Sequence, residues 1–272
     1  MMCNKKLKPV IKWTGSKRSQ ADFILSFFPE KINTYYEPFL GGGSIMGMAN
    51  FEKAVCGDIC EPLINLWNEI KKNPKNVALE YSKNWTNMQE IGYTYYYKVR
   101  DEFNKNKDPN LFLFLTRTCC NGLIRFNQNG DFNNSLHLSR KGIIPTSLET
   151  IIMEWSNKIQ NVEFKLADYK ETTKNAKPGD LIYLDPPYFY NKDRYMSNLN
   201  YDEFLEYLKD LNMRGIKFIL SFDGKRGNKD YDIELPKDLY KRKFSVKSGN
   251  SSVNNVLNQK KETVFESLYL NW

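Results

Sequence analysis

The sequence has one histidine, no C-x-x-C pair and no long hydrophobic run, and each absence excludes a class of protein. Its 272 residues include five cysteines without a regular spacing, and His137 is the only histidine. A four-ligand zinc site needs several such residues together, so we expect no metal site. An odd number of cysteines without a disulfide framework favours a reducing compartment, and we expect a cytoplasmic protein.

Membrane segments, repeats and phosphate loops are also missing. Apolar runs such as LFLFL at 111–115 are too short to span a bilayer, and the basic N-terminus leads into no apolar signal-peptide segment. We therefore expect no membrane partner. Without internal repeats or a G-x-x-x-x-G-K-[ST] motif, a solenoid and a P-loop nucleotide site are excluded.

The composition is that of a folded, basic protein. Hydrophobic residues make up 41% and aromatic residues 14%, and 40 Lys and Arg against 32 Asp and Glu give a net charge of +8. This combination excludes a disordered basic tail and favours a polyanionic partner. The excess of basic residues is distributed unevenly along the chain. Residues 71–160 include 13 basic and 8 acidic residues, a net charge of +5.

Predicted strands and helices alternate along most of the chain. We expect strands at 34–40 before a glycine turn, 53–57, 162–168, 180–188 and 216–222, helices at 17–28, 44–49, 62–70 and 201–215, and a final antiparallel pair at 241–246 and 263–270. Such alternation predicts an α/β fold with an open, largely parallel sheet and helices on both faces.

One long insertion interrupts this alternation. Val162 follows Asp58 by 104 positions, whereas a helical crossover needs roughly 20–30 residues. We expect an inserted, mostly helical region at 71–160, between the two parts of a catalytic domain at 1–70 and 161–272. A turn-rich stretch at 121–135 predicts a loop or short hairpin. An insertion beside the carboxyl ends of the strands can bind something large next to the ligand crevice.

The DPPY sequence at 185–188 predicts a site for an amino group. It follows an apolar strand, and Pro186 and Pro187 stiffen the backbone and remove two N–H donors. The Asp185 carboxylate and the Pro186 carbonyl then form a row of acceptors that suits an exocyclic amine. Tyr188 offers a flat face to a planar base. The simpler alternative is a proline-stiffened turn.

The EPFLGGGS sequence at 37–44 predicts a glycine turn that a cofactor approaches closely. Asp58, at the end of the following strand, is placed to accept hydrogen bonds from ribose hydroxyls. Because Glu37 lies close by and no phosphate loop is present, a nucleoside cofactor without phosphates is favoured over ATP or NAD.

Five segments in order give the chain a family resemblance. They are KWTGSK (12–17), EPFLGGGS (37–44), Asp58, CNGLIRFN-x-x-G-x-FN (120–133) and DPPY (185–188). Together they resemble the Dam-like, alpha-group DNA adenine N6-methyltransferases, over roughly residues 9–270. The resemblance implies a Rossmann-like sheet, S-adenosyl-L-methionine as the methyl donor, and 71–160 as the target-recognition region. It also implies direct methyl transfer to the N6 amine of an adenine flipped out of double-stranded DNA.

The same resemblance implies a role for each matched residue. Catalytic roles fall to Asp185, Pro186, Pro187 and Tyr188; cofactor-binding roles to Trp13, Lys17, Glu37, Pro38, Gly41, Gly43, Asp58, Asp168, Tyr169 and Asp185; and DNA-binding roles to Asn121, Gly122, Arg125, Asn127, Arg140 and Lys141. Arg125 corresponds to an arginine that binds the O6 and N7 edge of a guanine. No metal is required.

Departures from the family pattern concern the target sequence. Ser16 stands where a second glycine is usual. Cys120 replaces an aromatic residue, and NSLHLSRKG at 134–142 replaces a Val-Pro-Phe-Gly stretch. GATC or a related short site is the leading expectation, and a restriction endonuclease is a further expected partner.

Two alternatives differ in substrate or in kind. One is an amino-group methyltransferase for RNA or a protein glutamine, although those sites begin with Asn where this chain has Asp185. The other is a nuclease or a non-catalytic DNA-binding partner, for which 163–165 supplies an E-x-K without an upstream Pro-Asp.

Overall fold

A largely parallel sheet forms the centre of the molecule. The computed structural model describes residues 6–137, 139, 141–187, 199–222, 225–226, 229–230, 235–250 and 263–272. Its strands are β1 (Tyr35–Glu37), β2 (Ala54–Asp58), β3 (Val162–Leu166), β4 (Leu181–Leu184), β5 (Lys217–Phe222), β6 (Lys225–Arg226), β7 (Lys229–Asp230), β8 (Arg242–Asn250) and β9 (Thr263–Leu270). Parallel strands lie in the order β3, β2, β1, β4, β5, and β9 extends the sheet antiparallel to β5. The expected α/β sheet is confirmed.

The order of the strands reverses between β1 and β4. The chain proceeds outward from β1 to β2 and β3, and then returns to place β4 on the other side of β1, with Tyr35 paired to Leu181. In an open α/β sheet the crevice for a ligand forms where the strand order reverses, at the carboxyl ends of the strands. Glu37 ends β1 and Asp185 follows β4, so this reversal brings them to one place.

Side chains alternate between the two faces of the sheet. Tyr35 and Tyr183 lie in the hydrophobic cluster on one face, while Tyr36 and Ile182 lie in the cluster on the other. The second cluster is covered by α7 (Tyr169–Thr173) and α8 (Tyr201–Met213). The first is covered by α1 (Ala21–Leu25) and α2 (Glu61–Lys72). The prediction of helices on both faces is confirmed.

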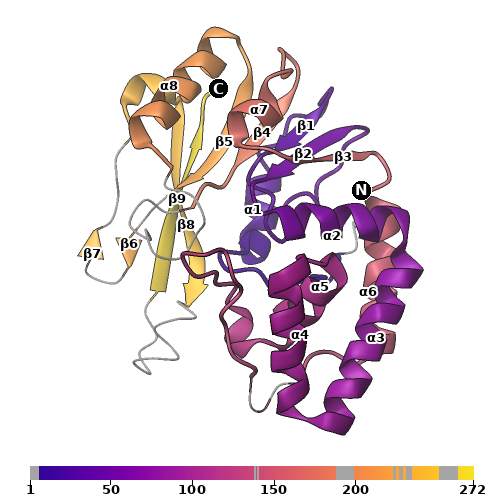
Figure 1. The fold of residues 1–272 in the computed structure, drawn as a ribbon. Coiled ribbons are helices and arrows are strands. Elements are labelled where there is room, and N and C mark those ends of the chain that lie inside the picture. The colour runs from indigo at the N-terminus through magenta and orange to yellow at the C-terminus, as the bar shows by residue number, and fades with distance from the viewer. Residues whose placement is uncertain are drawn as a thin grey trace.

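The insertion packs onto the first of these clusters. It contains α3 (Pro74–Ile91), α4 (Tyr93–Asn106), α5 (Pro109–Thr118), the 3₁₀ turn η2 (Cys120–Gly122) and α6 (Pro145–Lys158), which lie together below the sheet in Figure 1. Trp67 of α2 contacts Trp155 of α6, with ring centroids 5.0 Å apart, and stacks on Phe164 of β3. One hydrophobic cluster therefore runs from the sheet into the insertion.

Helix 17–28 is shorter than predicted, and helix 44–49 does not form. The first is a 3₁₀ turn, η1 (Lys17–Ser19), followed by α1. The second is a turn in which the Met46 amide donates to the Glu37 carboxylate, 2.9 Å away, instead of to a backbone carbonyl.

The remaining expected elements form with small changes at their ends. Strand 180–188 stops at Leu184 before the two prolines, which cannot donate to a neighbour. The final antiparallel pair is confirmed as β8 and β9, and β6 and β7 are short strands that the sequence did not predict. None of the helices in the described ranges is long and apolar enough to cross a bilayer.

Gly47 allows α6 to pack closely on the turn that follows the glycines. A Cβ at Gly47 would lie 2.3 Å from Cη2 of buried Trp155. We expect Gly47→Ala to lower the free energy of unfolding by about 1–3 kcal/mol, because an overpacked core must shift. Urea unfolding measures this. Met213→Ala, at a position 80% exposed, is the control and should change it by less than about 0.5 kcal/mol. Equal effects of the two variants would contradict the close packing.

Candidate active site

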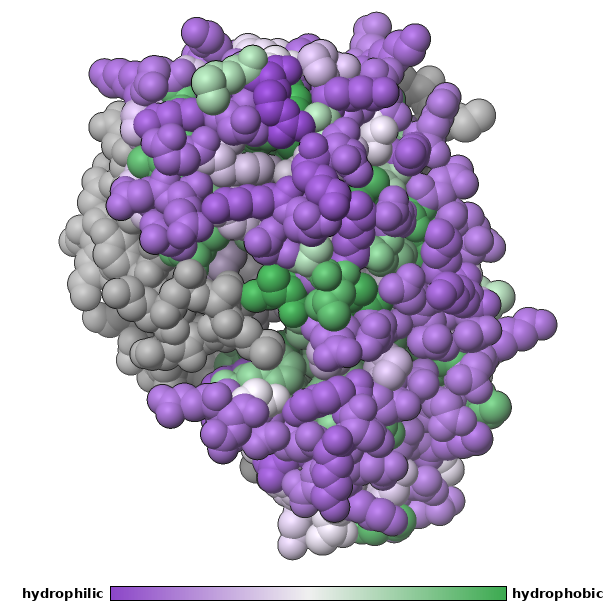
Figure 2. Space-filling model, turned by 45° about the horizontal axis from the view of Figure 1, so that its top comes forward, coloured by the Kyte–Doolittle hydropathy of each residue, from purple (hydrophilic) through white to green (hydrophobic). Residues whose placement is uncertain are grey.

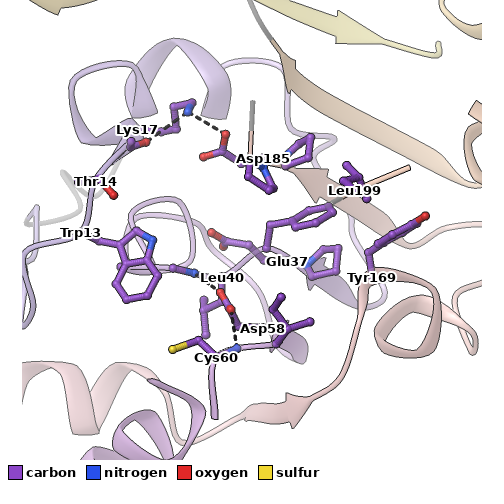
Figure 3. Close-up of a pocket in the computed structure, with 18 of the residues that line it drawn as sticks. Trp13, Thr14, Lys17, Glu37, Leu40, Asp58, Cys60, Tyr169, Asp185 and Leu199 are labelled. Atoms are coloured by element: carbon purple, nitrogen blue, oxygen red, sulfur yellow. Dashed lines mark hydrogen bonds and ion pairs between the residues drawn. The ribbon is translucent and has the colours of Figure 1, made fainter. Parts of the chain in front are cut away.

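A cavity of about 330 Å³ lies at the carboxyl ends of the central strands. Its walls come from the segment 13–17, the glycine turn, the end of β2, the start of α7 and the residues after β4 (Figure 3). The predicted cofactor and catalytic residues that line it are Trp13, Lys17, Glu37, Pro38, Gly41, Asp58, Asp168, Tyr169, Asp185, Pro186 and Pro187. On the face drawn in Figure 2, hydrophilic side chains cover most of the surface and hydrophobic ones gather near the middle.

The glycine turn is held by Asp58 and covered by Trp13. One Asp58 oxygen accepts from the Gly41 amide and the other from the Cys60 amide, both at 3.0 Å. Gly41 has a φ of +47°, and a Cβ there would lie 2.7 Å from Nε1 of Trp13. Only glycine allows both this backbone conformation and this contact.

Gly43 lies in the same turn and does not line the cavity. Its φ is +64°, and a Cβ would lie 2.9 Å from Cε of Met46 and 3.2 Å from the Trp67 ring. Gly43 therefore shapes the turn by close packing toward the core.

Glu37 is buried at the floor of the cavity. Its Oε2 accepts from the Tyr35 hydroxyl at 2.7 Å and from the Met46 amide at 2.9 Å. Burial raises the pKa of Glu37 to about 8; these two hydrogen bonds oppose the rise, and the nearby Asp185 adds to it. A cation placed beside Glu37 would favour its ionised form.

Asp185 and Lys17 form an ion pair at the opposite wall. Lys17 Nζ lies 2.7 Å from Asp185 Oδ1, and the lysine side chain is 4% exposed. Figure 3 shows the second Asp185 oxygen turned toward the cavity. Burial raises the pKa of Asp185 to about 6, against the lowering effect of Lys17, and Glu266 also raises it. One oxygen of a restrained carboxylate thus remains available as an acceptor.

Tyr169 and Phe39 give the cavity a flat aromatic wall. Their rings stack with centroids 5.6 Å apart and an interplanar angle of 23°. Asp168 precedes Tyr169 and accepts from the Glu171 amide at 2.8 Å, so it caps the start of α7. The cap fixes the position of the ring beside the cavity.

The turn-rich stretch of the insertion forms the predicted short hairpin. Phe126 pairs antiparallel with Phe132, and Asn127 Oδ1 accepts from the amides of Asn129 and Asp131, each at 2.9 Å. Arg125 is exposed and donates through Nε to Asn133 Oδ1 at 2.7 Å. Asn127 thus shapes the turn, and Arg125 presents its remaining guanidinium donors to solvent.

Other predicted DNA-binding residues flank this hairpin in the sequence. Asn121 is exposed with a φ of +55°, and Lys141 is exposed. Gly122 is buried with a φ of +64°, and a Cβ there would lie 2.7 Å from Cβ of Lys12. None of these lines the cavity. The predicted residues Arg140 and Tyr188 lie outside the described residues.

The hairpin also supplies cavity residues that the sequence analysis missed. Ile124 and Phe126 line the cavity, although they belong to the insertion. They alternate with exposed Arg125 and Asn127, and this two-residue period was the available signal. Phe39, Leu199 and Asn200 were missed as well. Among the described residues, no group of three or more His, Cys, Asp or Glu could hold a metal ion.

Burial of Glu37 makes the stability of the protein depend on pH. The pKa of Glu37 is about 8 in the folded protein and 4.5 ordinarily, so folding favours its protonated form. The stability that results is fully present below pH 4.5 and is lost as the pH rises toward 8. The slope reaches about 1.4 kcal/mol per pH unit. We expect Glu37→Gln to remove this loss, so that its stability relative to the wild type increases from pH 5 to pH 8 in urea unfolding. Exposed Glu163→Gln should follow the wild type, and parallel curves for all three proteins would contradict the assignment.

Comparison with known proteins assigns the family. The model for the D12 class N6 adenine-specific DNA methyltransferases matches residues 13–255. The DNA adenine methylase of Haemophilus influenzae is 33% identical over 67% of this chain, which spans 64% of that relative's length. The type II methyltransferase M.MjaIII of Methanocaldococcus jannaschii is 27% identical over 98% of this chain and 99% of that protein.

A solved structure, the rRNA methyltransferase aviRa from Streptomyces viridochromogenes, aligns with a TM-score of 0.39 and 9% identity, over 100% of this chain and 87% of that one. A similarity of this extent carries no argument about substrate. The family match covers the glycine turn, the hairpin and Asp185 together, and the chain belongs to the D12 class N6 adenine-specific DNA methyltransferases.

Proposed function

We propose that this protein transfers a methyl group from S-adenosyl-L-methionine to the N6 amine of an adenine in double-stranded DNA. The family supports this substrate class. The main structural observation is the Asp185 carboxylate, which Lys17 holds on one side and which faces a deep cavity on the other. Such an acceptor suits an amine that must be oriented for attack.

The charge of the cavity suits this cofactor. Its described lining includes five acidic residues, Glu37, Asp58, Asp168, Asp185 and Glu203, and one lysine, Lys17, so it stays anionic even while Glu37 is protonated. An anionic cavity favours a ligand with cationic groups and disfavours one with phosphates. S-adenosyl-L-methionine has a sulfonium and an ammonium group, and when bound it supplies an already activated methyl group.

Three parts of the cavity would hold the parts of this cofactor. Glu37 would bind the ammonium group, and the cation would keep its carboxylate ionised. Asp58 would accept from the ribose hydroxyls, because each of its oxygens has a lone pair beyond the one used by a backbone amide. The stacked rings of Tyr169 and Phe39 would contact the adenine.

Asp185 would act on the target amine. Its oxygen that faces the cavity would accept a hydrogen bond from N6 and direct the nitrogen lone pair toward the methyl group. As the N6–methyl bond formed, the bond from the methyl carbon to sulfur would break and S-adenosyl-L-homocysteine would leave. The amine would release one proton, and this Asp185 oxygen would receive it. Pro186 and Pro187 offer no N–H donors that would compete for the same oxygen.

The insertion would bind and read the DNA. An adenine must leave the base stack to reach this cavity, which costs a few kcal/mol that contacts to the DNA must offset. Region 71–160 has a net charge of +5, as binding to phosphates requires. Its hairpin presents Arg125 to solvent while Ile124 and Phe126 line the cavity. One short segment would thus hold a residue that reads the DNA and two residues that line the catalytic cavity.

Narrower features of the activity are also part of this proposal. We place GATC or a related short site as the target, and a restriction endonuclease as a working partner, since one relative is named a type II methyltransferase. We place the activity in the cytoplasm, where the free thiols of Cys56, Cys60, Cys119 and Cys120 remain reduced.

Transfer of a tritiated methyl group to DNA, RNA and a glutamine peptide tests the proposal. We expect label in duplex DNA, located at N6 of adenine by sequencing. Asp185→Ala should reduce the rate by about 100-fold or more, because the aligning acceptor is lost, while binding of duplex DNA persists in fluorescence anisotropy. Asp210→Asn, on the exposed side of α8, is the control. Label in RNA or peptide alone, or full activity of Asp185→Ala, would overturn the assignment.

Arg125 should determine preference for one base pair. A bidentate arginine contact contributes about 1–3 kcal/mol of discrimination, or roughly 10–100-fold. We expect Arg125→Ala to reduce the rate ratio between the preferred site and its single-base variants by this factor at one position. Arg100→Ala, an arginine of α4 that packs over Tyr97, should change all rates evenly. Unchanged ratios in Arg125→Ala would exclude this contact.

A further inference from the structure

Lys17 lies between two carboxylates that are far apart in the sequence. Its Nζ is 2.7 Å from Asp185 Oδ1 and 3.6 Å from Glu266 Oε2, and it donates to the Gly15 carbonyl at 3.2 Å. Gln20 donates to the same Glu266 oxygen at 2.8 Å. Lys17, Gln20 and Glu266 are 3%, 3% and 7% exposed, so water screens this group little.

Lys17 contributes one positive charge to this cluster, and Asp185 and Glu266 contribute two negative charges. The lysine ammonium has three N–H donors. Asp185 Oδ1, Glu266 Oε2 and the Gly15 carbonyl lie around it. Glu266 is on β9, two strands from β4, and Gln20 fixes the oxygen that faces Lys17. The attraction of Lys17 is thus divided between Asp185 and a carboxylate that does not line the cavity.

We propose that Glu266 is a positioning residue that shares the charge of Lys17 with Asp185 and so keeps Asp185 a strong acceptor for the target amine. This inference rests on the proposed function only for the identity of that amine. A carboxylate bound to an undivided lysine charge accepts hydrogen bonds less strongly and takes up a proton less readily.

The other charged and titratable groups around Asp185 do not replace Glu266. Glu37 on β1 interacts with Asp185, but its Oε2 already accepts hydrogen bonds from the Tyr35 hydroxyl and the Met46 amide. Tyr183 on β4 interacts with both Asp185 and Lys17, and its hydroxyl is paired with Ser221 at 2.8 Å. Lys17 lowers the pKa of Asp185, and Glu266 raises it. Removal of the Glu266 charge therefore lowers the pKa of Asp185.

Glu266→Gln tests this because the amide keeps an oxygen for Gln20 and loses only the charge. Carbon NMR of labelled aspartate carboxyl groups, with Asp185 identified through Asp185→Asn, follows the titration of Asp185 in the free protein. We expect its midpoint to fall by about one pH unit. The pH profile of the methyl-transfer rate at saturating cofactor should have its acidic limb displaced to lower pH. Its plateau rate should be several-fold lower.

Glu163→Gln is the matched control, since Lys165 lies at the same 3.6 Å from Glu163 but the Glu163 side chain is 59% exposed. It should leave the Asp185 midpoint unchanged. Glu266→Asp keeps the charge at a greater distance and should give a smaller displacement in the same direction, so it tests the inference even if Glu266→Gln does not fold. An unchanged Asp185 midpoint in either folded variant would overturn it. Absence of methyl transfer by the wild type would instead overturn the proposed function, while the titration still tests Glu266.

Discussion

The parallel pairing of β1 with β4 is the constraint on which the rest of the site depends. Because the strand order reverses between them, the chain leaves these neighbours toward opposite edges of the sheet, and a cavity remains at their carboxyl ends. Glu37 and Asp185 enter it from adjacent strands. Each is buried enough to have a raised pKa. The fold therefore holds two carboxylates in a place where each needs a cation or a hydrogen-bond donor.

Each buried carboxylate of this cavity has hydrogen-bond donors or a cation that offset the cost of its burial. Tyr35 and the Met46 amide stabilise Glu37, two backbone amides stabilise Asp58, and Lys17 stabilises Asp185. The bonds from Gly41 to Asp58 and from Met46 to Glu37 also hold the glycine turn and the turn that follows it, where a helix was expected. An anionic cavity in a chain of net charge +8 requires that the basic residues lie elsewhere, and the insertion has most of that excess. Under the proposed function, cofactor and DNA would therefore meet surfaces of opposite charge.

The insertion and the sheet are joined more closely than two separate domains would be. One hydrophobic cluster continues from β1 and β2 into α3–α6, and the Trp67–Trp155 contact lies at the junction. The hairpin then returns to the cavity, where Ile124 and Phe126 form part of its lining. Exposed Arg125 lies between these two cavity residues in the sequence, so a shift of this hairpin reaches both the surface and the cavity.

The sequence by itself determined the sheet, its helices on both faces, the insertion and eleven residues of the cavity lining, because short apolar strands, glycine turns and the DPPY sequence are local signals. It also indicated the family from five segments. Only the tertiary structure showed that Gly43 packs toward the core, that Ile124 and Phe126 line the cavity, and that Glu266 shares Lys17 with Asp185. Glu266 reaches Lys17 through antiparallel pairing of β9 with β5, a contact between segments hundreds of positions apart that no local pattern of residues specifies.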